Sequence, residues 1–307
     1  MGGVLGALFL GWALGANDAA SIYGPAVASR AVRYRTALVV AMVFVVLGAC
    51  MGSARTLHTV GTLSQQTPRS ALAITAAAAL SMTVLVVLRL PSSSSQAVVG
   101  AIVGGAWGRG VALDAAALGR ILQGWVLTPL VAAFLGFAGA ALLSRLGRRR
   151  HAGFLQLDPL VRTALLALGA WCAFALGANN AANVSGVVVA SGVLAPFPGA
   201  ALAGGSIALG IASFGWRLVD LVGDKLVRFE PPTALVVMLA QALTVHLFAL
   251  WGLPVSMSQA LAGGALGIGL AKGVRTLGRR AFLHVLLGWV ATPLAGGVLA
   301  YAFVHVL

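Results

Sequence analysis

The motif GANDAA at residues 15–20 lies within an apolar stretch and recurs as GANNAA at residues 177–182. Two further motifs recur in the same order, and the pairs are PSSSSQ at 91–96 with PVSMSQ at 254–259, and GWVLTPL at 124–130 with GWVATPL at 288–294. The three offsets are 162, 163 and 164 residues. Three motifs in one order and at nearly one offset indicate that the chain consists of two copies of one unit.

The composition of the chain decides its environment. Of its 307 residues, 60 % are hydrophobic and 8 % are charged, whereas about 25 % of a soluble domain is charged. This composition, with a mean hydropathy of +1.00, excludes a soluble globular protein, a disordered chain and a disulfide scaffold. Apolar stretches of about 20 residues recur throughout, and the alternation typical of a transmembrane β-barrel is absent. We therefore expect an all-α polytopic membrane protein.

The duplication predicts two transmembrane repeats, 1–143 and 161–307, joined by a cytoplasmic linker at 144–160. Each repeat contains five apolar segments, near 3–29, 37–53, 71–90, 91–108 and 119–143, and near 162–191, 199–215, 233–253, 254–271 and 281–305. Segments three and four of each repeat form either two crossings or one re-entrant hairpin with the Ser/Gln motif at its tip. Both alternatives give an odd number of crossings. The second repeat is then inverted, with interrupted helices or hairpins at the midplane, as in secondary transporters.

The net charge of +14 comes from basic clusters between the apolar segments, which we interpret as topology signals and not as a nucleic-acid surface. If the N-terminus lies outside, the inside loops contain the basic clusters at 30–35, 145–150, 217–228 and 272–280. The outside loops then contain only Arg55, Arg69, Arg109 and Arg120. Because positive residues favour the inner face, we expect a multi-pass protein of the cell (inner) membrane with both termini outside.

Asp18 is the one acidic residue that lies well inside an apolar segment. A carboxylate at the bilayer centre costs about 2.5–3.5 kcal/mol, so it needs a partner. We interpret Asp18 as a ligand of a coupling cation or as a site that carries a proton. The alternative is a structural hydrogen bond to a neighbouring helix.

Amide side chains surround this position in both copies of the motif. Asn17 and Asp18, together with Asn179, Asn180 and Asn183, lie in Gly/Ala-rich breaks of apolar segments. Carboxylate and amide oxygens suit a hard cation such as sodium, and interrupted helices also free N–H groups for an anion. The alternative is that these small and polar residues only allow helices to pack closely. We favour a binding site, with sodium at Asp18, Asn17 and Asn180.

A second candidate set follows the prolines of the Ser/Gln motif. Its members are Ser92, Ser93, Ser94, Ser95 and Gln96 in the first copy and Ser256, Ser258 and Gln259 in the second. Hydroxyls and free N–H groups at a helix start make a compact cradle for an anion. Helix capping by serine is the alternative interpretation.

Two threonines and one arginine complete the candidates. Thr128 and Thr292 each precede a proline inside an apolar segment, where the pair either kinks the helix or offers a hydroxyl to a cation. Arg89 precedes the serine run. In a hairpin it lies near the midplane and pairs with an anion, whereas in a full crossing it snorkels to the inner face. We favour the second alternative.

These motifs resemble those of the PiT family of inorganic phosphate transporters, which carries a Gly-Ala-Asn-Asp-x-Ala-Asn motif and a downstream Pro-x-Ser-Thr/Ser-x motif in each of two inverted repeats. The resemblance covers essentially the whole chain. It implies symport of phosphate with sodium or, in some members, with protons. It also implies that Asp18, the asparagines, the Ser/Gln motifs and the two threonines line the phosphate and cation sites.

The sequence departs from the family pattern at two positions. Asn180 stands where phosphate carriers usually have Asp, and Ser21 stands where the pattern has Asn. Ser21 joins the candidate cation ligands by its position. Some family members transport sulfate, and the second motif of this chain is similar to theirs. Hydrogen phosphate donates a proton to a carboxylate, whereas sulfate only accepts, so the phosphate and sulfate alternatives both stay open.

We therefore expect a secondary active symporter that imports phosphate, with a sulfate permease as the alternative. An uncoupled anion channel on the same scaffold is a less favoured alternative. A membrane enzyme such as a lipid phosphatase is disfavoured, because a single intramembrane acid without a paired histidine does not form a catalytic cluster. The expected partners are phosphate or sulfate, the coupling ion and the bilayer, without a further cofactor. A homodimer is compatible with the sequence.

Overall fold

The computed structural model describes residues 2–88, 92–147, 159–225, 230–273 and 279–307. Within these ranges the chain is helical apart from turns, short loops and one isolated bridge between Ser64 and Leu113. The helices are α1 (Gly2–Ala28), α2 (Tyr34–Gly52), α3 (Ala54–Thr62), α4 (Pro68–Val87), α5 (Ser94–Gly108), α6 (Ala115–Gly147), α7 (Pro159–Ala190), α8 (Pro196–Lys225), α9 (Pro231–Leu250), α10 (Met257–Lys272) and α11 (Arg279–Val306).

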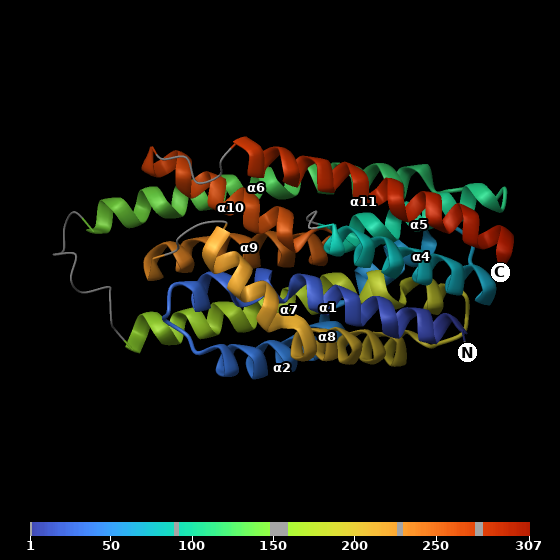
Figure 1. Ribbon diagram of the computed structural model, residues 1–307, viewed down its shortest axis with the longest axis horizontal. Helices are drawn as coiled ribbons and strands as arrows, with labels where there is room; N and C mark the ends of the chain where they lie inside the picture. The colour runs from blue at the N-terminus through green and yellow to red at the C-terminus, as the bar shows by residue number, and fades with distance from the viewer. Residues whose placement is uncertain (1, 89–91, 148–158, 226–229, 274–278) are drawn as a thin grey trace.

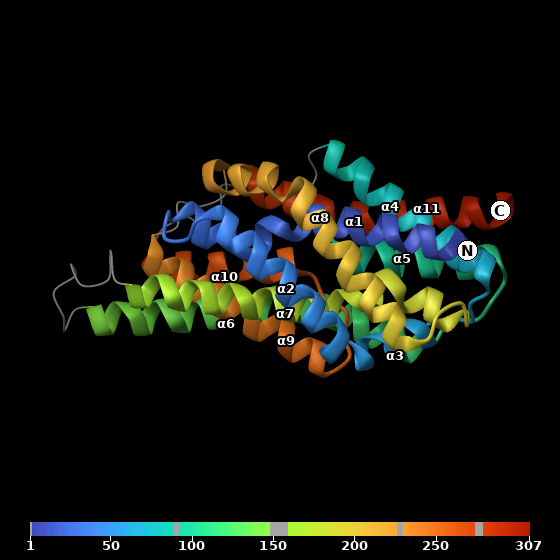
Figure 2. The same ribbon diagram turned by 90° about the horizontal axis from the view of Figure 1, so that it is seen from below.

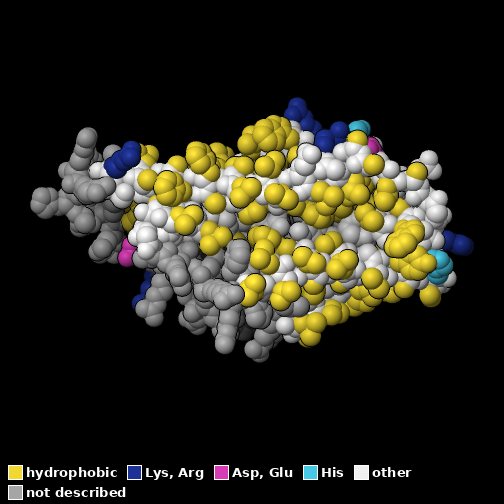
Figure 3. Space-filling model, turned by 90° about the horizontal axis from the view of Figure 1, so that it is seen from above, with side chains coloured by type: hydrophobic (Ala, Val, Ile, Leu, Met, Phe, Trp, Pro, Cys, Tyr) yellow, Lys and Arg dark blue, Asp and Glu magenta, His cyan; other side chains and the backbone are white. Residues whose placement is uncertain are grey.

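Among the described residues, eight helices are long and apolar enough to cross a membrane, namely α1, α2, α4, α6, α7, α8, α9 and α11. Large apolar side chains such as Leu130 and Phe134 of α6 and Val298 of α11 are exposed. Figure 3 shows hydrophobic side chains spread across the described part of the face in view, with Lys and Arg side chains near its margins. This surface is suited to lipid, and the chain is a multi-pass membrane protein.

Each of the ten predicted apolar segments corresponds to a helix. Nine of them begin and end within four residues of the predicted bounds, and α8 continues ten residues beyond the predicted end at 215. The prediction missed α3, so the first half of the chain contains six helices rather than five. Its sequence, ARTLHTVGT, is too short and too polar to register as an apolar segment.

The helices of the two halves pack in matching pairs. α1 packs along α8 as α7 packs along α2, and α5 packs on α11 as α10 packs on α6. In Figure 1, α1 begins at the end of the molecule where both termini lie, whereas α7 begins at the opposite end. Two inverted repeats produce this arrangement, in which each helix packs on the equivalent partner from the other half and equivalent helices run in opposite directions. The repeat boundaries at 143 and 161 stay a prediction.

The pairs α4–α5 and α9–α10 form two hairpins that enter from opposite ends. Both members of the first pair lie in the half of the molecule that holds the termini, and both members of the second pair lie in the other half (Figures 1 and 2). Each tip reaches the middle of a long helix, because Asn17 of α1 hydrogen-bonds Ser92, and Asn179 of α7 hydrogen-bonds Leu253. This arrangement is the re-entrant alternative rather than the two full crossings.

Glycines bring the second helix of each hairpin onto the other half of the chain. A Cβ atom added at Gly100 of α5 would overlap the carbonyl of Pro293 in α11, and one added at Gly263 of α10 would overlap the carbonyl of Pro129 in α6. Backbones approach this closely only where side chains are absent. The Thr-Pro segments of the long helices therefore lie directly against the hairpins.

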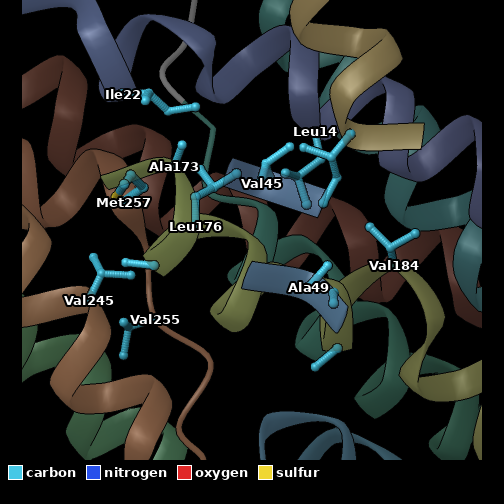
Figure 4. Packing of buried hydrophobic residues seen from close by; sticks show 14 of the residues in the cluster. Leu14, Ile22, Val45, Ala49, Ala173, Leu176, Val184, Val245, Val255 and Met257 are labelled. Carbon is cyan, nitrogen blue, oxygen red and sulfur yellow. The ribbon is translucent and has the colours of Figure 1, made fainter. Parts of the chain in front are cut away.

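Apolar side chains fill the centre around the hairpin tips. Figure 4 shows Leu14 of α1, Val45 of α2 and Leu176 of α7 in one buried cluster. Val255 and Met257, from the tip of the second hairpin, belong to the same cluster. The second tip therefore presents part of its sequence to the apolar core.

Candidate functional site

Asp18 is buried in the middle part of α1, with 3 % of its surface exposed. Its Oδ1 accepts a hydrogen bond of 3.0 Å from Nδ2 of Asn17. Its Oδ2 lies 3.5 Å from the hydroxyl of Ser94, at the start of α5. The predicted intramembrane carboxylate thus faces the tip of the first hairpin.

The same hydroxyl connects Asp18 to the second half of the chain. Ser94 Oγ donates a hydrogen bond of 3.1 Å to Oδ1 of Asn180 in α7, and Nδ2 of Asn183 donates one of 2.6 Å to the same oxygen. A hydroxyl has one proton, so Ser94 can serve either Asp18 or Asn180 at a given moment. We call Asp18, Ser94, Asn180 and Asn183 the polar centre.

The first asparagine of each motif, Asn17 or Asn179, hydrogen-bonds the tip of the hairpin that belongs to the same half of the chain. Asn17 donates to the carbonyl of Ser92 at 3.3 Å and accepts from its hydroxyl at 3.2 Å. Asn179 donates to the carbonyl of Leu253 at 3.0 Å and accepts from the N–H of Val255 at 3.1 Å. Both amides therefore satisfy backbone groups that the hairpin turns leave without a helical partner.

The serine motifs make one contact in common. The hydroxyls of Ser93 and Ser95 lie 3.3 Å apart, and those of Ser256 and Ser258 lie 2.9 Å apart. Ser256 also caps α10 by accepting a hydrogen bond from the N–H of Gln259, so the capping interpretation holds at that position. The N-termini of α5 and α10, with their free N–H groups and positive dipole ends, both lie at the tips.

Several buried polar atoms near the motifs lack a hydrogen-bond partner within the described part of the chain. They are Oε1 of Gln96, Oε1 of Gln259, Nδ2 of Asn180, Oδ1 of Asn183 and Oε1 of Gln241. An unsatisfied buried polar group costs about 1–3 kcal/mol. Two of these atoms belong to the polar centre and two to the tips, which is the pattern expected where a ligand completes the bonding.

Thr128 and Thr292 hydrogen-bond within their own helices, to the carbonyls of Gly124 and Gly288 respectively. Ser21 is buried one turn after Asp18, but its hydroxyl makes no hydrogen bond to the polar centre in the described ranges. These three predicted cation ligands are therefore not joined to the polar centre by side-chain hydrogen bonds. Arg89 lies outside the described residues.

Two side chains that reach the site were not predicted for that purpose. Gln241 of α9 donates a hydrogen bond of 2.7 Å to the carbonyl of Ser21, which Pro25 leaves free because proline has no N–H. Nε1 of Trp125 in α6 donates a hydrogen bond of 3.2 Å to the carbonyl of Pro254. A glutamine inside an apolar segment was the available signal for Gln241. No sequence signal identifies the partner of Trp125.

Comparison with known proteins places this geometry in context. The chain is 30 % identical to the sulfate permease CysP of Bacillus subtilis, over 98 % of this chain and 86 % of the relative. It is 27 % identical to "Putative phosphate permease MJ0630" of Methanocaldococcus jannaschii, over 95 % and 93 % of the two chains.

A solved structure titled "The sodium-dependent phosphate transporter" has the same fold, with a TM-score of 0.86, 20 % identity and coverage of 99 % and 98 %. The sequence pattern that defines the phosphate transporter family matches residues 14–300. This match covers nearly all of the chain. The chain therefore belongs to the phosphate transporter family.

Proposed function

We propose that the chain is a secondary active symporter that imports inorganic phosphate together with a coupling cation, either sodium or a proton. The observation that carries the proposal is the contact of one hydroxyl, that of Ser94, with the intramembrane carboxylate of Asp18 and with Asn180 of the other half. A site shared by two halves at the middle of the membrane is the arrangement from which alternating access proceeds.

The anion binds, on this proposal, between the two hairpin tips. Hydroxyl and N–H donors at the starts of α5 and α10 replace water around its oxygens. The orphaned Nδ2 of Asn180 adds one more donor. The proposed substrate ligands are Ser92, Ser93, Ser94, Ser95, Gln96, Asn179, Asn180, Asn183, Ser256, Ser258 and Gln259.

The cation binds beside Asp18. Asn17 and Asn180 contribute amide oxygens, and Ser21, Thr128 and Thr292 contribute hydroxyl oxygens. A hydroxyl that donates to its own helix keeps lone pairs for a cation, so the hydrogen bonds of the two threonines are compatible with this role.

Charge arithmetic links the two ligands. Importing a dianion against 100 mV, inside negative, costs about 4.6 kcal/mol, since each charge contributes roughly 2.3 kcal/mol. Two cations cancel this cost and a third lets the membrane potential drive uptake. Because Asp18 supplies one negative charge, the bound anion supplies the remainder, and each ligand should raise the affinity for the other.

Sulfate is the second candidate substrate. Asn180 removes a carboxylate that would repel sulfate, and the relative with 30 % identity carries the name sulfate permease. Hydrogen phosphate has a proton to donate to Asp18, whereas sulfate only accepts hydrogen bonds. On either substrate we propose a transporter and not an enzyme, with both termini outside the cell. Figure 1 places the two termini at the same end of the molecule.

The test is uptake of radiolabelled phosphate and sulfate by proteoliposomes with imposed sodium or proton gradients. We expect gradient-driven phosphate accumulation by the native chain and its loss in Asp18→Asn. Asp114→Asn is the matched control, because Asp114 caps α6 at the surface and asparagine caps a helix equally well. Accumulation of sulfate alone would select the second candidate, conductance without accumulation would select a channel, and movement of neither anion would refute the proposal.

A further inference from the structure

Helix α3 marks a departure from the match between the two halves. At the repeat offset of 162 residues, α2 and α3 together correspond to α8, and α3 falls on residues 216–224. Those residues continue α8 as one helix, whereas α3 is a separate helix after a break at Ser53. In Figure 2, α3 lies in the half of the molecule that also holds both termini.

α3 contacts the tip of the second hairpin and the motif of α7. Nη1 of Arg55 donates a hydrogen bond of 2.6 Å to the carbonyl of Leu250, at the end of α9. The hydroxyl of Thr56 donates one of 2.9 Å to the carbonyl of Ala178, the residue before Asn179. Gly252 lies against Arg55 in a left-handed conformation, with φ of 74°.

A pocket of about 340 Å³ opens between α3 and this tip. Its lining includes the polar side chains of Arg55, His58 and Thr59 and the ring of Trp251, and it includes no acidic residue. Liquid water occupies roughly 30 Å³ per molecule, so the pocket has room for a small hydrated ion. Arg55 and His58 are exposed.

The pocket adjoins the proposed substrate site through the covalent chain. Gly252 lines the pocket, and the next residue, Leu253, accepts the hydrogen bond from Asn179 that anchors the tip. On the other wall, Thr56 bonds the residue that precedes Asn179. The tip of the second hairpin and the N-terminal part of α3 therefore contact both the pocket and the residues that precede Asn180 of the polar centre.

We propose that this pocket is an outer anion site, at which Arg55 binds the transported tetrahedral oxyanion before it passes the tip of the second hairpin. The inference rests on the proposed function. A guanidinium carries five N–H groups in a planar fork that matches an oxyanion, and the bond to Leu250 uses one of them. His58 lies beside it as a second donor, and Trp251 walls the pocket.

On this proposal, the outer site affects the binding of the anion from the outside solution and not its later movement across the membrane. A positive charge at the mouth of a binding site raises the local concentration of anions and the rate of their association. Removing the charge should therefore raise the external KM and leave the maximal rate unchanged. The effect should weaken with ionic strength, because the screening length falls from about 30 Å at 0.01 M salt to about 10 Å at 0.1 M.

The experiment measures uptake of labelled phosphate and sulfate into proteoliposomes by Arg55→Gln, Arg55→Lys and, as the matched control, Arg120→Gln, an exposed arginine on α6. We expect Arg55→Gln to raise KM on the order of 3- to 10-fold at low salt, Arg55→Lys to raise it less, and Arg120→Gln to leave it unchanged. His58→Glu adds a negative charge without removing the bond to Leu250, and it should also raise KM.

An unchanged KM in both Arg55→Gln and His58→Glu would overturn the proposal. This result is also the one expected if a lipid headgroup fills the pocket. A fall of the maximal rate without a change of KM would overturn it as well, because Arg55 would then only brace the tip. A native chain that accumulates neither anion would refute the proposed function, so the two failures are distinguishable.

Discussion

The two copies of the motifs keep the same anchors but differ in chemistry. In both, the first asparagine, Asn17 or Asn179, fixes a hairpin tip. The contact between two serine hydroxyls, Ser93 with Ser95 and Ser256 with Ser258, also recurs. By contrast, the carboxylate of Asp18 is matched by the amide of Asn180, and the position of Ser94 in the first tip is taken by Met257 in the second.

This difference separates the positions that hold the hairpins in both halves from the positions that give the polar centre its chemistry. Shared residues hold the hairpins in place, because both halves need the same architecture. Ser94 lies in the polar centre, whereas Met257 packs in the apolar cluster of Figure 4. The polar centre therefore depends on one hairpin for its hydroxyl and on one motif for its charge. The following predictions test this division.

The largest effect is expected at the glycines that both halves share. Gly104→Ile and Gly267→Ile each place a branched side chain onto the backbone of α11 or α6, where even a Cβ atom would overlap a carbonyl. We expect each to destabilise the protein by more than about 3 kcal/mol and to abolish the monodisperse peak in size-exclusion chromatography. Gly119→Ile is the control, since a Cβ atom there meets no atom within 4 Å. If only one of the two variants lost its monodisperse peak, the two halves would not depend equally on their close helix contacts.

The anchoring asparagines should give the next largest effect. Asn179→Ala leaves the carbonyl of Leu253 and the N–H of Val255 without partners, at about 1–3 kcal/mol for each buried group. Asn17→Ala leaves the carbonyl of Ser92 and Oδ1 of the buried Asp18 without this donor, and it frees a hydroxyl that can rotate to another acceptor. Thermal unfolding in detergent should therefore show losses of similar size for the two variants. A loss confined to one variant would contradict the equal role of the two anchors.

Exchanging the unlike tip residues tests the chemistry directly. Ser94→Met removes the hydroxyl that bridges Asp18 and Asn180, and we expect uptake at low substrate concentration to fall at least about tenfold. Met257→Ser adds a hydroxyl within the apolar cluster and should change uptake by less than about threefold. Transport assays on protein with matched thermal stability separate this effect from misfolding. Equal losses in the two variants would mean that both tips contribute alike.

The sequence was sufficient to predict ten of the described helices, because apolar length and internal repetition are both visible in it, but it did not reveal the short and more polar α3. It left the hairpins open, because a segment of about 20 residues such as 71–90 is long enough to cross and also long enough to turn back. Asp18, Asn180 and the serines were identified as candidates from their unusual polarity. Their pairing was not, since contacts such as that of Ser94 with Asn180 depend on how α5 meets α7.

The smallest and most informative change is Asn180→Asp, which makes the second motif resemble the first. A carboxylate there can accept the proton of hydrogen phosphate but repels sulfate, so we expect the ratio of phosphate to sulfate uptake to rise on the order of threefold. The double variant Asp18→Asn/Asn180→Asp is the control, because it moves the charge to the other copy and keeps the total constant. The hydroxyl of Ser94 lies within hydrogen-bonding distance of both side chains. If the coupling cation requires the carboxylate at position 18, beside Asn17, the double variant stays inactive. Recovery of transport would instead show that the polar centre needs one carboxylate on either side.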